Sequence, residues 1–332
     1  MTQPSPATVR TIHAFYQKAH RAPVPPAKRV TAAPPSFFLI GAPRCGTTML
    51  SAALKGNPQI SFSKPKETQF FLLAPEDWSD EALRQRYLEL HHPTLSAEHA
   101  ALGDGSVSYL YSPACLRRAL RFDPRARFIV TVRNPLELVP SHHARMVYTL
   151  DEDVTDFATA WRLQGVRAAG QRLPKRCRDP RVLQYGSVGA LGDHVERLLD
   201  IAGPERCLVL VYDDIARDPR DAYRAVLDFI GVPDDGRQSF GLKAENRGYK
   251  SPFLQQFVMN PPRWLFPLIR VADTAMIKRL KRVRRRLEKA NRRPAQRPQL
   301  ADAMAAELRA FYADDVRKLG ELLSRDLDHW LA

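Results

Sequence analysis

The segment between residues 41 and 48 has the residue types needed to bind an anion through backbone and side-chain donors. It reads Gly-Ala-Pro-Arg-Cys-Gly-Thr-Thr and follows the apolar run 37–40. An apolar strand, a glycine-bounded loop and a helix over 48–55 direct backbone N–H groups and the positive end of the helix dipole at an anion. The candidate binding residues of this loop are Arg44, Cys45, Gly46, Thr47 and Thr48.

The loop differs from nucleoside-triphosphate loops at one position. Gly41, Gly46 and Thr48 match the pattern Gly-x4-Gly-Lys-Ser/Thr, but Thr47 stands where that pattern has lysine. The positive charge lies inside the loop instead, at Arg44. The pattern favours an anionic nucleotide other than ATP, and a small-molecule kinase built on the same loop is kept as an alternative.

A second motif, Arg-Phe-Ile-Val-Thr-Val-Arg-Asn-Pro over 127–135, has the same layout of strand, loop and helix. Arg133 follows the expected strand 126–132, at the edge where open α/β sheets bind their ligands. Its guanidinium group suits a phosphate because it offers charge and paired donors. Ser141 lies farther along, about two turns into the expected helix.

Taken together, the two motifs resemble the 5′-phosphosulfate loop and the 3′-phosphate site of the sulfotransferases that use 3′-phosphoadenosine 5′-phosphosulfate (PAPS) as donor. The resemblance runs from about residue 36 to the end of the sequence. The stretch Lys-Glu-Thr-Gln-Phe-Phe over 66–71 is similar to one in the heparan-sulfate-type and bacterial branch of that family. The resemblance implies in-line, metal-independent sulfuryl transfer to a hydroxyl acceptor, a carbohydrate or another small molecule.

The resemblance also implies roles for individual residues. Arg44 and the rest of its loop would hold the 5′-phosphosulfate, and Arg133 and Ser141 the 3′-phosphate. Glu67 is expected to be the base that takes the acceptor proton, a role open to a positioned carboxylate. A lysine would assist the leaving phosphate, and the sequence does not decide between Lys64 and Lys66. The stretch 246–251 resembles a late loop over the nucleotide, which makes Arg247 and Lys250 further candidates.

Some residues offer rival chemistry or depart from the family pattern. His142 and His143 are alternative bases, since histidine titrates near neutrality. Cys45 is not a phosphatase nucleophile, because such a loop needs arginine six residues later, where Ser51 stands. The family's usual Gly-x-Tyr and Tyr-Glu-Asp are replaced by Gly-Ser-Val over 186–188 and Tyr-Asp-Asp over 212–214.

Composition limits the partners and the compartment. The 332 residues hold four scattered cysteines, without the paired spacing of a zinc site, and no apolar run of about 18 residues. These features favour the cytoplasm. The formal net charge is +15, and one basic cluster occupies 278–293. This cluster could bind polyanions or an anionic lipid surface, which would make the protein membrane-peripheral, whereas nucleic acid is disfavoured because no nucleic-acid fold signature is present.

The order of elements predicts an α/β fold. Strands at 37–40, 126–132 and 207–212 alternate with helices at 48–55, 76–90, 189–201 and 219–230, which favours a P-loop-like, doubly wound and mostly parallel sheet flanked by helices. We expect a proline-rich segment over 1–35 with a short helix at 8–20. A single domain follows over 36–332. Its part from 262 onward is expected to be a helical appendage that contains the basic cluster as one amphipathic helix.

Overall fold

The computed structural model describes residues 33–177, 179–241, 247–259, 274–294 and 300–332. They group into two compact units. Unit 1 comprises the described residues of 33–138, 186–241 and 305–332, and unit 2 those of 139–185 and 247–304. The helix expected at 8–20 lies outside the described residues. The single domain expected over 36–332 stays a prediction.

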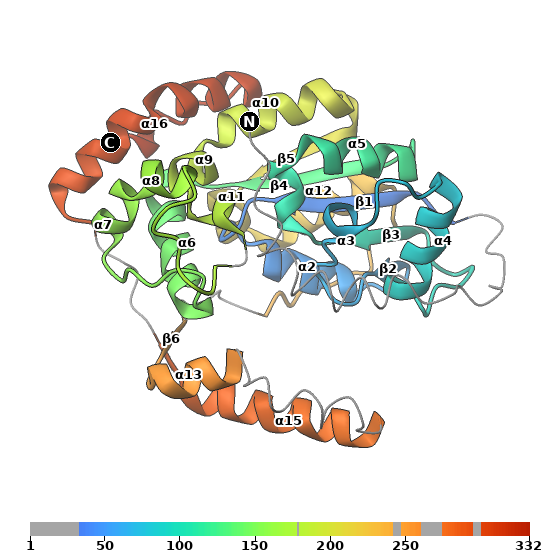
Figure 1. Ribbon diagram of the computed structural model, residues 1–332. Helices are drawn as coiled ribbons and strands as arrows, with labels where there is room; N and C mark the ends of the chain where they lie inside the picture. The colour runs from blue at the N-terminus through green and yellow to red at the C-terminus, as the bar shows by residue number, and fades with distance from the viewer. Residues whose placement is uncertain (1–32, 178, 242–246, 260–273, 295–299) are drawn as a thin grey trace. The chain divides into compact units, whose positions relative to one another are not determined.

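Within the described part of unit 1, five parallel strands form one sheet (Figure 1). The strand order is β2 (Ile60–Phe62), β3 (Ala101–Asp104), β1 (Ser36–Gly41), β4 (Arg127–Val132) and β5 (Cys207–Val211). The chain builds one side of β1 first and then crosses to the other side. The carboxyl ends of β1 and β4 therefore meet where the strand order reverses, which is where doubly wound sheets bind ligands. The predicted fold class is confirmed.

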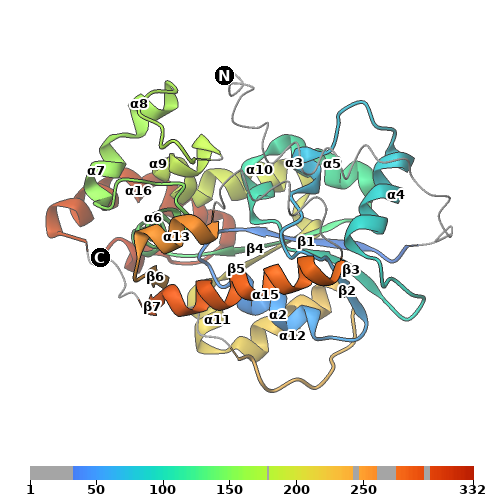
Figure 2. The same ribbon diagram turned by 60° about the horizontal axis from the view of Figure 1, so that its bottom comes forward.

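The two faces of β1 pack against different helices because successive side chains of a strand point to opposite sides. Phe37 and Leu39 join a buried cluster with residues of α2 (Thr47–Lys55) and α12 (Pro219–Ile230). Phe38 faces the other way, with its ring 5.7 Å from that of Phe71 and 6.4 Å from that of Tyr109. In Figure 2, α2 and α12 lie together on one side of the sheet. Both faces are thus covered, as a parallel sheet requires.

The other elements of unit 1 connect the strands or cover the sheet. They are α3 (Phe70–Leu73), α4 (Asp80–His91), η1 (Val107–Tyr111), α5 (Pro113–Phe122), α10 (Leu191–Ala202), η3 (Pro204–Arg206), α11 (Tyr212–Arg217), α16 (Asp302–Leu323, which starts in unit 2) and η4 (Asp328–Trp330). Helix α12 matches its predicted bounds, with Asp218 as N-cap, Pro219 in the first turn and Gly231 at the left-handed C-cap. Helix α4 starts later than predicted because the Ser79 side chain caps it by accepting from the Ala82 amide.

Unit 2 contains helical segments and a short two-stranded sheet. Its elements are most of α6 (Pro135–Thr149), α7 (Phe157–Arg162), α8 (Gln164–Ala168), η2 (Pro180–Leu183), the start of α9 (Tyr185–Gly189), β6 (Arg247–Tyr249), α13 (Pro252–Met259), α15 (Thr274–Asn291) and β7 (Arg292–Pro294). Strands β6 and β7 are antiparallel. The helix predicted over the basic cluster is present as α15 up to Asn291, whereas Arg292 and Arg293 of the cluster belong to β7. Among the described residues, no helix has the length and apolar character needed to span a bilayer.

Candidate functional site

The loop between β1 and α2 adopts a conformation that concentrates backbone donors. Arg44 and Gly46 have positive φ angles of 67° and 85°, and Gly46 is the left-handed N-cap of α2. A side chain at Gly46 would be strained by the positive φ angle and crowded as well, because a Cβ atom there would lie 3.2 Å from Tyr212 Cδ2. The first amides of α2 have no acceptor within the helix, so Thr47 and Thr48 present N–H groups at the carboxyl edge of the sheet.

Lys66 brings a positive charge to this loop from a distant part of the sequence. Its Nζ atom donates to Thr47 Oγ1 over 3.3 Å and pairs with Glu67 Oε1 over 3.3 Å. Thr47 occupies the position that is lysine in triphosphate loops, and the Lys66 ammonium group lies beside it. Lys64 differs, since among the described residues its exposed side chain forms no hydrogen bond or ion pair.

Glu67 lies beside the loop with its side chain accessible. The carboxylate is 43% exposed, whereas the Lys66 side chain is 25% exposed. A base needs access to the acceptor as well as a fixed position. The structure therefore brings Glu67, Lys66 and the β1–α2 loop together in unit 1.

Arg133 connects the two predicted motifs directly. Its side chain is 8% exposed, and Nη1 donates to the Arg44 carbonyl oxygen over 3.1 Å. The guanidinium group also pairs with Glu137 in the first turn of α6 and lies 4.5 Å from the centroid of the Tyr212 ring. A nearly buried cation thus lies next to the β1–α2 loop at the β1/β4 junction, where doubly wound sheets bind their ligands.

Cys45 is buried beneath the loop. Burial raises the pKa of its thiol to about 12, and the thiol donates to the Pro43 carbonyl oxygen over 3.5 Å. A thiol with such a pKa is not a nucleophile near neutral pH. All four cysteines of the sequence lie in the described part and are free.

Ser141 and the two rival bases belong to unit 2, where all three are buried. His142 donates from Nε2 to the Val182 carbonyl oxygen over 2.8 Å, and His143 donates to that of Val154 over 2.9 Å. Burial lowers the pKa of His143. The meeting of Ser141 with Arg133 at one phosphate stays a prediction.

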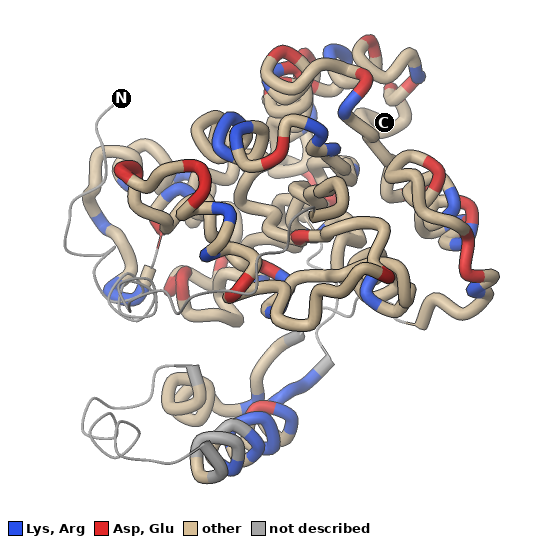
Figure 3. Tube along the Cα trace, turned by 90° about the vertical axis from the view of Figure 1, so that its right-hand side faces the viewer, with Lys and Arg blue, Asp and Glu red and all other residues tan. Residues whose placement is uncertain are grey.

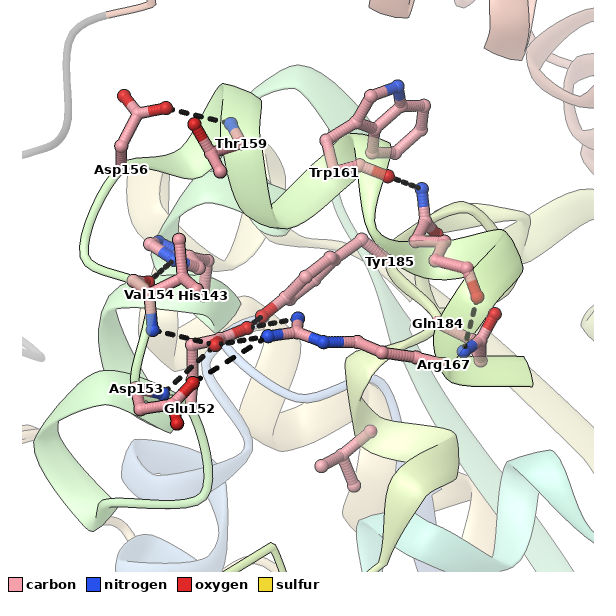
Figure 4. A network of polar contacts seen from close by, with 12 residues as sticks. His143, Glu152, Asp153, Val154, Asp156, Thr159, Trp161, Arg167, Gln184 and Tyr185 are labelled. Atoms are coloured by element: carbon pink, nitrogen blue, oxygen red, sulfur yellow. Dashed lines mark hydrogen bonds and ion pairs between the residues drawn. The ribbon is translucent and has the colours of Figure 1, made fainter. Parts of the chain in front are cut away.

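Figure 4 shows why His143 is fixed in the interior of unit 2. Arg167 and Glu152 form a fully buried ion pair of 2.6 Å, and the Tyr185 hydroxyl donates to the same carboxylate over 2.6 Å. The Glu152 carboxylate also accepts from the backbone amide of Val154, whose carbonyl oxygen binds His143. These contacts hold the loop after α6 and account for the position of His143 without a catalytic role.

The structure describes only part of the stretch 246–251, which contains the candidate nucleotide contacts Arg247 and Lys250. The side chain of Arg247 lies outside the described residues, although its backbone forms part of β6. Lys250 is exposed, and its amide donates to the Asn291 carbonyl oxygen over 2.8 Å. Their contact with a nucleotide stays a prediction.

Sequence reasoning missed Tyr212 and the end of the chain as supports of the site. The Tyr212 ring lies between Gly46 and Arg133. The next residue, Asp213, accepts a hydrogen bond from Trp330 Nε1 over 3.2 Å, and the Trp330 carbonyl oxygen accepts one from Asn134. A signal was available for Tyr212, because it directly follows a parallel strand, just as Arg133 does.

Among the described residues, no group of three or more His, Cys, Asp or Glu side chains has an arrangement that could hold a metal ion.

Comparison with known proteins agrees with this geometry. The model of the sulfotransferase family matches residues 35–236. Human bifunctional heparan sulfate N-deacetylase/N-sulfotransferase 3 is 25% identical over 214 residues, which cover 60% of this chain and 22% of that protein. The crystal structure of a sulfotransferase from Alicyclobacillus acidocaldarius has a TM-score of 0.61 and 24% identity, covering 91% of this chain and all of that one. Since the family model spans more than half of the sequence, the chain belongs to the sulfotransferase family.

Proposed function

We propose that the protein transfers a sulfuryl group from PAPS to a hydroxyl acceptor by in-line displacement. The bond between sulfur and the bridging oxygen of the 5′-phosphate breaks while the acceptor oxygen bonds to sulfur. The acceptor proton passes to Glu67, and 3′-phosphoadenosine 5′-phosphate (PAP) leaves. As in phosphoryl transfer, alignment and the stabilisation of charge on the leaving group are the main tasks of the protein.

One observation carries this proposal: the Lys66 ammonium group lies 3.3 Å both from Thr47 of the anion-binding loop and from Glu67. A cation in this position can stabilise the charge that grows on the bridging oxygen. The adjacent carboxylate can accept the proton from the attacking hydroxyl. Charge stabilisation and proton acceptance are therefore supported by neighbouring groups in unit 1, and the proposed reaction needs no metal.

The remaining candidates fit the donor. Arg44, Cys45, Gly46, Thr47 and Thr48 form the proposed 5′-phosphosulfate site through amides, hydroxyls and the Arg44 charge. Arg133 is the proposed 3′-phosphate residue, because its nearly buried guanidinium group lies against this loop. Ser141, Arg247 and Lys250 are further proposed donor-binding residues, on the family resemblance alone.

Ligand-dependent stability tests the donor assignment. PAP should raise the melting temperature, since a ligand that binds only the native state stabilises it. ATP with magnesium should raise it much less, and an equal or larger shift would favour the kinase alternative. Sulfate transfer from PAPS should then be measured on carbohydrates, phenols and lipids. Amino sugars belong in the panel because the human relative is named as an N-sulfotransferase.

We propose anionic lipid as a second partner, through α15. Figure 3 shows Lys and Arg along this helix. Met276, Leu280 and Val283 are 53%, 45% and 46% exposed, and they recur at the spacing of one helix face. The rest of the helix surface carries exposed arginines, namely Arg279, Arg282, Arg284, Arg285 and Arg286. A basic, amphipathic helix of this kind can lie in an anionic membrane surface.

Sedimentation with vesicles tests the lipid proposal. Phosphatidylglycerol-containing vesicles should bind the protein, and vesicles of phosphatidylcholine alone should not. Leu280→Ser should weaken binding at every salt concentration, whereas high salt should remove only the electrostatic part. Stronger binding to heparin or nucleic acid than to these vesicles at the same salt would contradict the assignment. With this partner the protein would be membrane-peripheral, and we propose the cytoplasm as its compartment.

A further inference from the structure

A buried carboxylate lies directly behind the loop that carries Lys66 and Glu67. Asp104, the last residue of β3, is 1% exposed. Its Oδ2 atom accepts hydrogen bonds from Thr68 Oγ1 over 2.6 Å and from the Tyr87 hydroxyl over 2.9 Å, and Oδ1 accepts one from the Ser106 amide over 2.8 Å. Burying a carboxylate is costly unless donors surround it. The three donors offset this cost, although burial still raises the pKa of Asp104.

The loop is attached to this carboxylate and its neighbours at several points. The Gly105 amide donates to the Lys66 carbonyl oxygen over 3.0 Å, and the Gln69 amide donates to Ser106 Oγ over 3.1 Å. Thr68 lies between Lys66 and Gln69 in the sequence. It is 1% exposed, and its hydroxyl donates a hydrogen bond to Asp104. The positions before and after Glu67 are therefore both fixed to residues 104–106.

The backbone of the loop needs this attachment. Gln69 has a φ angle of 51°, a left-handed conformation that costs free energy for any residue other than glycine. Strained conformations persist when surrounding contacts determine them, and here the Gln69 amide and the preceding Thr68 side chain are both bound. Gly105 also leaves room for the Lys66 side chain, because a Cβ atom at residue 105 would lie 2.8 Å from Lys66 Cγ.

We infer that Asp104 is a positioning residue for sulfuryl transfer, which acts through Thr68 to hold Glu67 and Lys66 against the donor loop. This inference rests on the proposed function, in which Glu67 is the base. Displacing a catalytic group by about 1 Å can cost roughly 10²-fold in rate. The contribution of Asp104 should therefore appear in turnover and not in donor affinity.

Thr68 and Tyr87 form a matched pair for testing the inference. Each donates a hydrogen bond from a neutral hydroxyl group to the same oxygen of Asp104, but only Thr68 belongs to the loop that carries Lys66 and Glu67. Thr68→Val should lower kcat by roughly 10–100-fold with an unchanged Kd for PAP. Tyr87→Phe should lower the melting temperature and leave kcat within about twofold of the wild type. Thr68→Ser, which keeps the hydroxyl, should restore most of the rate.

A double-mutant cycle separates positioning from general damage to the fold. In a Glu67→Gln background, Thr68→Val should cause a smaller further loss of rate than in the wild type, because of the two groups that it positions only Lys66 still functions. Asp104→Asn gives the same comparison should Thr68→Val be too unstable to purify. Normal turnover in Thr68→Val, or an equal loss in Tyr87→Phe, would overturn the inference. Full activity in Glu67→Gln alone would instead overturn the proposed base, so the two failures are distinguishable.

Discussion

The guanidinium group of Arg133 lies over the ring of Tyr212, with its central carbon 4.5 Å from the ring centroid. The edge of the same ring lies against Gly46. One aromatic side chain at the end of β5 thus supports the loop after β1 and the arginine after β4. Cation–π contact favours this position of the charge and costs Arg133 none of its hydrogen-bond donors.

Arg133→Ala should weaken PAP binding by roughly 2–5 kcal/mol, because the variant removes a nearly buried charge from the proposed 3′-phosphate site. Adenosine 5′-phosphosulfate lacks the 3′-phosphate, and its affinity should change much less. Calorimetric titration of both ligands measures the difference. Arg121→Ala is the matched control, since Arg121 forms an exposed ion pair with Asp80. Unchanged PAP affinity in Arg133→Ala would remove this residue from the donor site.

Replacing each lysine in turn resolves which one assists the leaving phosphate. Lys66→Met should lower kcat by at least about tenfold, because it removes the cation beside Thr47 and Glu67. Lys64→Met is the matched control, and its rate should stay close to that of the wild type, since the Lys64 side chain is exposed. Single-turnover rates with saturating PAPS are the measurement. A larger loss in Lys64→Met would reverse the assignment.

Glu67→Gln keeps the shape of the side chain and removes the proton acceptor. Sulfate transfer should fall by roughly 10²–10⁴-fold, the range for loss of a general base, and PAP affinity should survive. If Glu67 were only a surface partner of Lys66, the loss would be about 0–1 kcal/mol of stability with normal turnover. Glu81→Gln, at an exposed position of α4, controls for the substitution itself. Normal turnover in Glu67→Gln together with a marked loss in His142→Ala would identify a different base.

The sequence is sufficient to predict strands β1, β4 and β5 and the loop after β1 because their signals are local, whereas β2 and β3 were not predicted. Buried parallel strands are short apolar runs, and helix α12 has its cap, proline and glycine within the segment itself. The late start of α4 shows the limit of such signals. The apolar spacing included Trp78, but the hydrogen bond from the Ala82 amide to Ser79 decided that the helix begins after residue 79.

The site could be predicted only as a set of residue types. Lys64 and Lys66 are both lysines close to Glu67, so the sequence does not distinguish them. The structure does, because Gly105, directly after β3, lies under the Lys66 side chain. The sequence indicates only that Tyr212 follows a strand, since its role comes from two contacts with residues that are far apart in the sequence. Long-range packing, which one sequence does not display, therefore supplies the details of the site.

Acid should destabilise the fold through His92, which is 3% exposed and shares a 3.0 Å hydrogen bond between its Nδ1 atom and Ser61 Oγ. Burial lowers the pKa of His92 to about 3, helped by the neighbouring charges of His91 and His99. The unfolded chain protonates this imidazole near pH 6.5, while the native state keeps it neutral. The unfolded state then binds more protons, so the stabilisation is complete above about pH 6.5 and decreases as the pH falls toward 3.

Urea unfolding at pH 7 and pH 5 measures this effect. The contribution of one such histidine to the free energy of unfolding should fall by roughly 2 kcal/mol between these pH values. His92→Gln cannot be protonated, so its stability should depend less on pH than that of the wild type by about this amount. His329→Gln is the control, because His329 is exposed and its replacement should leave the pH dependence unchanged. Parallel pH profiles for the wild type and His92→Gln would show that His92 is protonated in the native state as readily as in the unfolded chain.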